Sequence, residues 1–137
     1  MALAAVMEDV RALIGAGTSW TEGTDLFAYE WGVDADGEEI GRQVLVRDDE
    51  PIDTDLKDIY EQPVVSIIVR GESTDDGKTV HDLAREIYEF MLAQNTQTIN
   101  GIKYLGFEPV GGLIPLGRDK NERFGYSMTF FTYRNPT

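Results

Sequence analysis

The chain has 137 residues, a length that suits one domain with one hydrophobic core. Its formal net charge is −13 and it has no cysteine, which excludes disulfides, thiolate metal sites and cysteine nucleophiles. A surface this acidic repels nucleic-acid phosphates and anionic membranes, so neither is expected as a tightly bound partner.

The first half of the sequence predicts one helix and two strands. Apolar residues recur at helical spacing over residues 3–14, with Glu8, Asp9 and Arg11 on the opposite side. These charges, and the lack of a basic leader, favour a helix over a signal peptide. Alternating aromatic residues predict a strand over residues 27–33, and a second strand is expected at residues 43–47. Because turn residues lie between them, we expect a hairpin.

The middle of the chain changes from acidic to apolar. Residues 48–61 are rich in carboxylates and contain Pro51, which predicts a surface loop. Residues 64–69 are apolar on both faces, as in a central strand that is covered on both sides. Val80, Ala84 and Ile87 begin an apolar stripe that predicts a helix over residues 80–93.

The last part of the chain predicts two strands, at residues 102–107 and 124–133. Between them, residues 108–122 are rich in glycine and proline, and we expect a long loop there. The order of elements predicts one α+β domain over residues 1–137. Its sheet should be mostly antiparallel, with about 4–5 strands and two helices packed on it.

Motifs that carry chemistry are weak in this sequence. The glycines at residues 15–17 are not followed by Gly-Lys-Ser/Thr, so a helix end explains them better than a phosphate loop. The acidic turn at residues 34–39 has its glycine too early for a calcium loop of the EF-hand type. His81 is the only histidine, and we interpret it as a partly exposed structural residue. We therefore expect no catalytic residue, no metal and no cofactor, and a protein that is not an enzyme.

The order of motifs in the second half resembles that of the tail terminator proteins of long-tailed bacteriophages, often catalogued as minor capsid or tail completion proteins. The resemblance rests on the apolar strand at residues 63–71, the following helix, Gly101-Ile102, the turn Gly117-Arg118-Asp119, and the aromatic strand at residues 123–130. The N-terminal helix followed by an aromatic strand is also similar.

This resemblance implies a structural virion protein that forms a ring, usually six-fold, on the last ring of the tail tube. Such a ring stops tube polymerisation and presents the surface that joins the head connector. The implied partners are further copies of the chain, the tail tube protein and a head–tail connector or neck protein. DNA would pass through without specific binding, no membrane would be involved, and assembly would take place in the host cytoplasm.

Three groups of residues are candidates for these contacts. A channel that passes DNA should be lined by negative charge, and an outer solvated face is the alternative for the same residues. The channel-lining candidates are Asp48, Asp49, Glu50, Asp53 and Asp55. The assembly-loop candidates, which a solvated loop tip would equally explain, are Arg118, Asp119, Lys120 and Arg123. A closed ring also needs two different patches on each subunit. The subunit-interface candidates are Trp20, Phe131 and Tyr133.

Two other functions remain open at this point. The first is another neck position, such as a head-closure or adaptor subunit, which the sequence barely distinguishes from a terminator. The second is a small cytoplasmic ligand-binding domain or enzyme. That function would require a deep pocket containing a buried carboxylate or His81.

Overall fold

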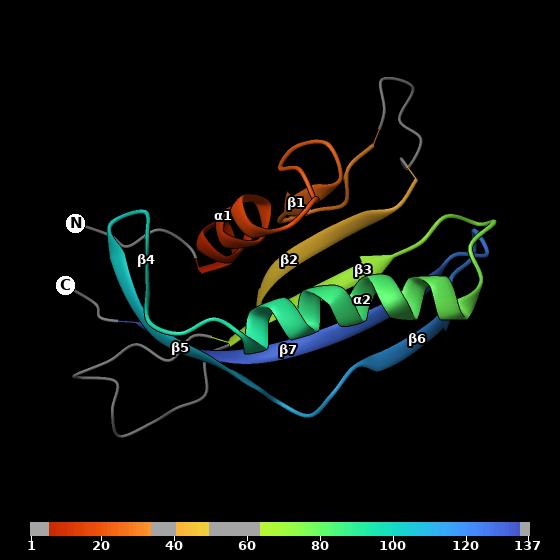
Figure 1. Ribbon diagram of the computed structural model, residues 1–137. Helices are drawn as coiled ribbons and strands as arrows, with labels where there is room; N and C mark the ends of the chain where they lie inside the picture. Colours follow the sequence, from red (N-terminus) through yellow and green to blue (C-terminus); the bar gives the residue numbers. More distant parts are fainter. Residues whose placement is uncertain (1–5, 34–40, 50–63, 135–137) are drawn as a thin grey trace.

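The computed structural model describes residues 6–33, 41–49 and 64–134 (Figure 1). Their elements are α1 (Val6–Gly17), β1 (Leu26–Ala28), β2 (Gln43–Asp49), β3 (Val64–Arg70), α2 (Gly77–Leu92), β4 (Gln97–Ile99), β5 (Ile102–Pro109), β6 (Ile114–Arg118) and β7 (Phe124–Arg134). Neither helix is long and apolar enough to cross a membrane, as far as the described residues go.

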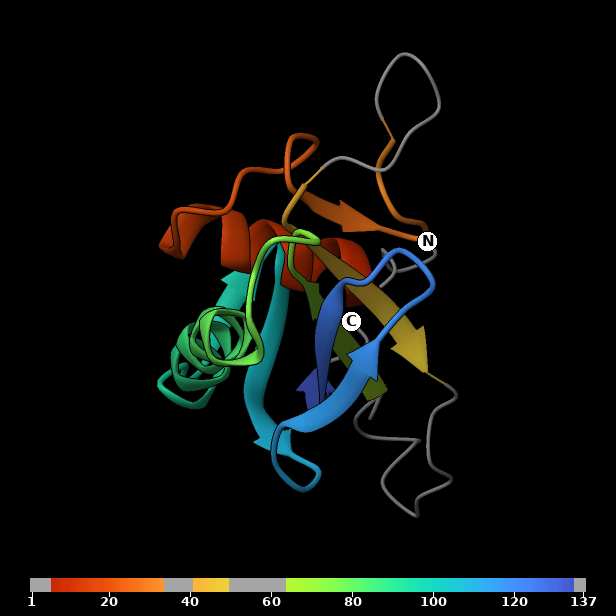
Figure 2. The ribbon, with the colours of Figure 1, turned by 90° about the vertical axis from the view of Figure 1, so that its right-hand side faces the viewer.

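The strands form one curled, mixed sheet of seven strands (Figure 2). Their order is β1-β2-β3-β7-β5-β4, and β6 also pairs with β7. Both β5 and β6 run antiparallel to β7 and occupy successive parts of its length: Pro109 pairs with Phe130, and Ile114 pairs with Ser127. The long strand β7 therefore pairs with two shorter strands, and the chain between β5 and β6 turns away from β7 before it returns.

The fold class expected from the sequence is wrong. The described residues form seven strands rather than about 4–5, in a curled mixed sheet, so the fold is mostly β rather than α+β. Two strands were missed: β4, which has three residues, and β6, which lies inside the glycine- and proline-rich segment that was expected to be a loop. Short strands and strands with proline give little alternation to detect.

The prediction that the first two strands form a hairpin is also wrong. β1 pairs with β2 in parallel, with Leu26 opposite Val44 and Ala28 opposite Val46. The connection over residues 29–42 is long enough for the chain to return to the start of β1, as a parallel pair requires. β1 is also shorter than the strand expected over residues 27–33.

The helix expected over residues 80–93 is confirmed as α2. Asp76 is its N-cap: the carboxylate accepts a hydrogen bond of 2.8 Å from the backbone N–H of Thr79. The buried side of α2 carries the apolar stripe, including Val80, Ala84 and Ile87, each fully buried. Burying such a stripe is what stabilises the helix in the fold.

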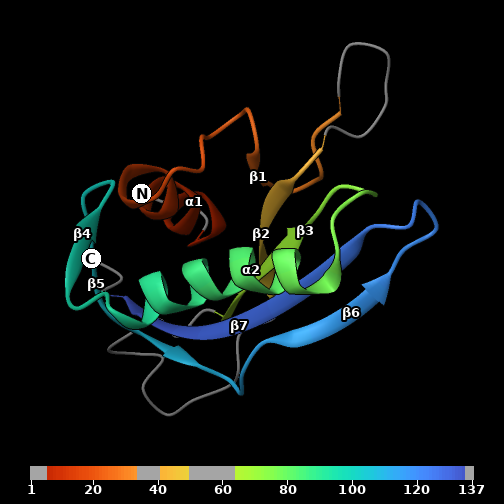
Figure 3. The same ribbon diagram turned by 45° about the vertical axis from the view of Figure 1, so that its right-hand side comes forward.

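Both helices pack on the same face of the sheet (Figure 3). α1 covers β1 and β2, and α2 covers β7 and β3. Alternate residues of β3 and β7, such as Ile67 and Phe130, enter this core and are fully buried. The other face carries Ile68, Phe131 and Tyr133, which are half-buried, and no helix of the described residues lies over it.

Candidate assembly surface

After β5 the chain turns away from the edge of β7 and returns to it as β6, and we call residues 110–123 the β6 arm (Figures 1 and 2). The arm leaves the edge of β7 after Val110, whose N–H donates to the carbonyl of Thr129 at 2.9 Å. Gly111 has φ = 77°, a conformation that favours glycine. The hydroxyl of Tyr88 donates to the Gly111 carbonyl at 3.2 Å, which connects this bend to α2.

The strand of the arm, β6, is exposed along its whole length. It pairs with β7 on one side, and no other strand of the described residues pairs with it. Pro115 supplies no N–H, and a β-bulge lies between Pro115 and Gly117. Prolines and bulges on an edge prevent another strand from adding to the sheet. A partner of β6 should therefore contact its side chains rather than its backbone.

Those side chains are apolar. Ile114 is 50% exposed, Leu116 is 51% exposed and Val110 is 39% exposed. Ile114 lies opposite Ser127 in β7. The Leu116 side chain lies 3.4 Å from the point where a Cβ of Gly125 would be. These two neighbours are small, so β7 leaves the apolar side chains of β6 uncovered on the face away from the helices.

The tip of the arm is organised by Asp119. Its Oδ1 accepts hydrogen bonds from the backbone N–H groups of Asn121 (2.8 Å) and Arg123 (3.0 Å), and its Oδ2 lies 3.5 Å from Nε of Arg70. Burial raises the pKa of Asp119, but these two N–H groups and the nearby arginine charges outweigh burial, so the pKa lies below its usual value. Asp119 is thus a structural residue of the turn.

The other three assembly-loop candidates differ in exposure. Arg118 lies over the ring of Phe124, 4.1 Å from its centroid, and donates to the Glu122 carbonyl at 2.7 Å. Arg123 is half-buried, whereas Lys120 is exposed. Arg118 and Lys120 are thus exposed, whereas Asp119 and Arg123 are half-buried.

The subunit-interface candidates are separated by the fold. Trp20 is 7% exposed and belongs to the hydrophobic core, so little of its side chain reaches the surface. Phe131 and Tyr133 are half-buried on the face away from the helices, and the Tyr133 hydroxyl donates to Glu108 at 3.0 Å. The apolar residues of β6 were missed, although Leu113-Ile114-Pro115-Leu116 is an apolar run in the sequence.

The channel-lining candidates lie mostly outside the described residues: this is true of Glu50, Asp53 and Asp55. Asp48 and Asp49 belong to β2. The Asp48 carboxylate accepts a hydrogen bond of 2.8 Å from the backbone N–H of Met7, near the start of α1. A carboxylate at a helix N-terminus is favourable, which gives Asp48 a structural explanation.

Asp9 of α1 is a buried carboxylate, although the sequence pattern predicts it on the solvent side of the helix. It is fully buried and accepts hydrogen bonds from the hydroxyl of Tyr104 and from Nδ2 of Asn100, the latter at 2.7 Å. Burying a charge requires such partners. The group is enclosed, so we interpret it as a connection between α1 and the β4–β5 hairpin.

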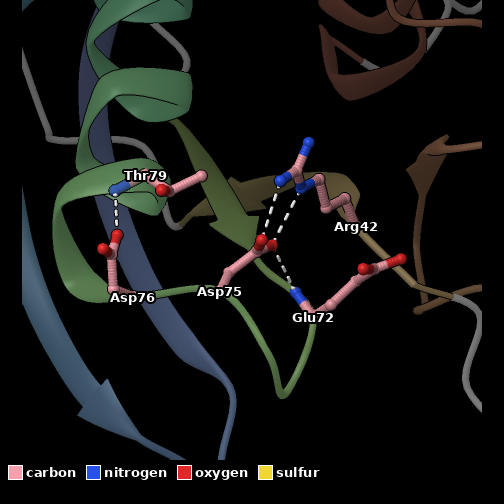
Figure 4. A network of polar contacts seen from close by, with 5 residues as sticks. All are labelled: Arg42, Glu72, Asp75, Asp76 and Thr79. Carbon is pink, nitrogen blue, oxygen red and sulfur yellow. Dashed lines mark hydrogen bonds and ion pairs between the residues drawn. The ribbon is translucent and has the colours of Figure 1, made fainter.

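A second polar network connects the start of β2 with the loop before α2 (Figure 4). Arg42 binds both oxygens of Asp75, with Nε–Oδ2 and Nη2–Oδ1 distances of 2.8 and 2.7 Å. The backbone N–H of Glu72 also donates to Asp75 at 2.8 Å. Chiefly because of the hydrogen bond from Arg42, the pKa of Asp75 lies below its usual value.

Neither network is arranged as a catalytic or metal site. In the part of the chain that the structure describes, no group of three or more His, Asp or Glu side chains could hold a metal ion. His81 lies edge-on to the ring of Tyr126, with 5.4 Å between centroids, and its side chain is 40% exposed. The surface with the clearest capacity to bind is the apolar side of the β6 arm.

Comparison with known proteins adds no assignment: no protein-family model and no curated protein matches the chain.

Proposed function

We propose that this protein is a structural assembly subunit of a long-tailed bacteriophage that forms a ring, hexameric by the family resemblance, at the head-proximal end of the tail tube. The ring stops tube polymerisation and provides the surface that joins the head. Its partners are other copies of the chain, the tail tube protein and a neck protein, and DNA passes through without specific binding.

The observation that carries this proposal is the β6 arm. A monomeric protein seldom exposes adjacent large apolar side chains on an edge strand, because each one costs free energy in water. Ile114 and Leu116 are both about half exposed, next to a tip with three basic residues in a chain of net charge −13. An apolar centre with a charged rim is typical of a surface that binds another protein.

The experiment is a tube-capping assay. The purified protein is mixed with tube protein that is polymerising in vitro, and the products are examined by negative-stain electron microscopy. We expect rings at one end of the tubes and shorter tubes as more protein is added. The variants Leu116→Gln and Leu92→Gln are compared in the same assay. Leu92 is 46% exposed at the end of α2 and is not part of the arm, so its variant should cap normally, while Leu116→Gln should cap poorly.

Absence of both rings and tube binding would refute the proposed function. If labelled protein instead binds to the connector of tailless heads and not to tubes, the terminator role is wrong and another neck position is favoured.

A further inference from the structure

The turn between β4 and β5 consists of Asn100 followed by Gly101. An asparagine before a glycine is prone to lose its side-chain amide, because glycine has no side chain to hinder attack by its own backbone nitrogen. Apart from the chain neighbours, no atom of the described residues lies within 4 Å of the point where a Cβ of Gly101 would be. The strand pairing is closed by Ile99 and Ile102, so the N–H of Gly101 is not needed for it.

The side-chain amide of Asn100 is held by α1. Its Nδ2 donates a hydrogen bond of 2.7 Å to Oδ1 of Asp9, and the hydroxyl of Tyr104 donates to the other oxygen of the same carboxylate. Asp9 is fully buried, whereas Asn100 is an exposed residue, so its amide reaches inward from an exposed turn. α1 and the β4–β5 hairpin lie side by side (Figures 1 and 3). The hydrogen bond therefore keeps the amide of Asn100 away from the backbone nitrogen of Gly101.

This restraint acts on a part of the fold that opens easily. β4 has three residues and is the last strand at one end of the sheet. Short strands at the end of a sheet separate by local fluctuation while the rest stays folded. A hydrogen bond to a charged group favours the closed arrangement by about tenfold or more. The contact with Asp9 therefore controls how often the side chain of Asn100 is released.

We propose that Asn100 is a site of spontaneous deamidation, and that its hydrogen bond to Asp9 controls the rate. When the hairpin opens, the backbone nitrogen of Gly101 attacks Cγ of Asn100 and forms a cyclic imide. The side-chain nitrogen leaves as ammonia, with the proton that the Gly101 nitrogen gives up. Water then opens the imide. Opening at Cγ gives aspartate, and opening at the backbone carbonyl gives isoaspartate, in which the chain runs through the former side chain.

Either product prevents the hairpin from closing as before. A carboxylate at residue 100 faces the buried carboxylate of Asp9, and like charges in contact repel each other. Isoaspartate also adds a carbon atom to the backbone of a turn that fixes the register of Ile99 and Ile102. Deamidation thus makes a transient separation of the hairpin from α1 permanent. This inference does not depend on the proposed function, because it concerns only a contact within one chain.

The test is the rate of deamidation of the full chain at neutral pH, measured by tryptic digestion and mass spectrometry. Cleavage after Arg85 and Lys103 gives one peptide that contains both Asn95 and Asn100. Asn95 is exposed and is followed by threonine, so it is an internal control for asparagine without a following glycine. Fragmentation of the peptide distinguishes the two positions, and chromatography separates the aspartate and isoaspartate products.

Four samples are compared: wild type folded, wild type unfolded in urea, folded Asp9→Ala and folded Tyr104→Phe. Tyr104→Phe also removes a hydrogen bond to Asp9, but it leaves the acceptor of Asn100 in place. It is therefore the matched control for a general loss of stability. The two variants are compared at urea concentrations at which they are equally folded, as measured by circular dichroism.

We expect Asn100 to deamidate at least about tenfold faster in unfolded than in folded wild type, and about tenfold faster in folded Asp9→Ala than in folded wild type. The rate in Tyr104→Phe should remain near that of folded wild type, and Asn95 should react slowly in every sample. Equal rates in the two variants would overturn the proposal, because stability rather than the Asp9 contact would then set the rate. An unfolded chain in which Asn95 reacts as fast as Asn100 would overturn it as well.

An exchange of charge tests the effect of the product and does not require Asp9→Ala to fold. Asn100→Asp should lower the melting temperature, because it brings two carboxylates together. In Asp9→Asn/Asn100→Asp the amide and the carboxylate exchange places, and most of the loss should be restored. Asn95→Asp, at an exposed position, should change the melting temperature little. A double variant that melts no higher than Asn100→Asp would refute repulsion at this contact, and with it the proposed effect of deamidation.

Discussion

Asp75 shows how one side chain can join the loop before α2 to the start of β2. It is 8% exposed and binds Arg42, whose side chain is 43% exposed, through two hydrogen bonds. Charge-assisted hydrogen bonds contribute about 1.5–3 kcal/mol, and solvent reduces this at the exposed arginine. We expect Asp75→Asn to lower the free energy of unfolding by about 1 kcal/mol at pH 7, measured by urea denaturation.

The pH dependence of that loss follows from the lowered pKa of Asp75. A carboxyl group with a lower pKa in the folded state stabilises the protein above its unfolded pKa, which is about 3.9. This stability is lost as the pH falls through the folded value. The difference between wild type and Asp75→Asn should therefore be constant at neutral pH and shrink below about pH 4. Asp82→Asn, at a carboxylate that is 60% exposed, is the control and should change little. A difference that grows in acid would contradict this assignment.

Tyr104 has a comparable role inside the core. It is fully buried, and its hydroxyl donates to the buried carboxylate of Asp9. Removing one partner of a buried charged group costs about 1–3 kcal/mol or more, because the other is left poorly solvated. We expect Tyr104→Phe to lower the unfolding free energy by about 2 kcal/mol in urea. Tyr133→Phe, which removes an exposed hydroxyl that bonds Glu108, should cost less than about 0.5 kcal/mol. Equal losses of unfolding free energy in the two variants would mean that the buried hydrogen bond to Asp9 stabilises the fold no more than the exposed one to Glu108.

At the scale of elements, the β4–β5 hairpin depends on its two-residue turn. Asn100 and Gly101 have φ values of 52° and 80°, and Ile99 pairs with Ile102 on either side. Positive φ at both central residues is typical of the type I′ turn, which favours Asn-Gly. We expect Gly101→Ala to cost about 1 kcal/mol in urea denaturation, because alanine is strained there. Gly106→Ala is the control: no atom lies within 4 Å of its added Cβ, so it should be nearly neutral. Equal losses of unfolding free energy in the two variants would argue against backbone strain at residue 101.

The elements also show what the sequence could and could not predict. The periodicity of α2 and the apolar run of β3 were sufficient to predict these two elements, because each buries a regular stripe of side chains. The sequence Thr98-Ile99-Asn100-Gly101-Ile102 signals a hairpin, yet this signal was missed because β4 is so short. Of the candidate assembly surface, only the charged tip was predicted. Exposure of Ile114 and Leu116 depends on the small residues opposite them in β7, and pairing between distant strands is not visible in a local pattern.

For the whole molecule, the net charge of −13 opposes both folding and association. Salt at about 0.1 M screens such repulsion beyond about 10 Å. Raising NaCl from about 0.01 M to about 0.15 M should therefore raise the melting temperature and strengthen self-association, measured by calorimetry and light scattering. The double variant Asp82→Asn/Glu86→Gln removes two exposed negative charges and should reduce the salt effect. Association that weakens with salt would mean that local ion pairs outweigh the overall repulsion.

The position of β7 has a consequence for how the molecule opens. β3 pairs with one edge of β7 from Gly125 to Phe131, while β6 and β5 pair along the other edge. No local fluctuation can separate it from both neighbours, so its amide protons should exchange with deuterium only through global unfolding. Those of β1 and β4, at the ends of the sheet, should exchange first. Hydrogen-exchange mass spectrometry would show this order, and equally fast exchange in β7 and β4 would contradict it. We therefore expect β7, which pairs with β6 of the arm, to be the last part of the fold to come apart.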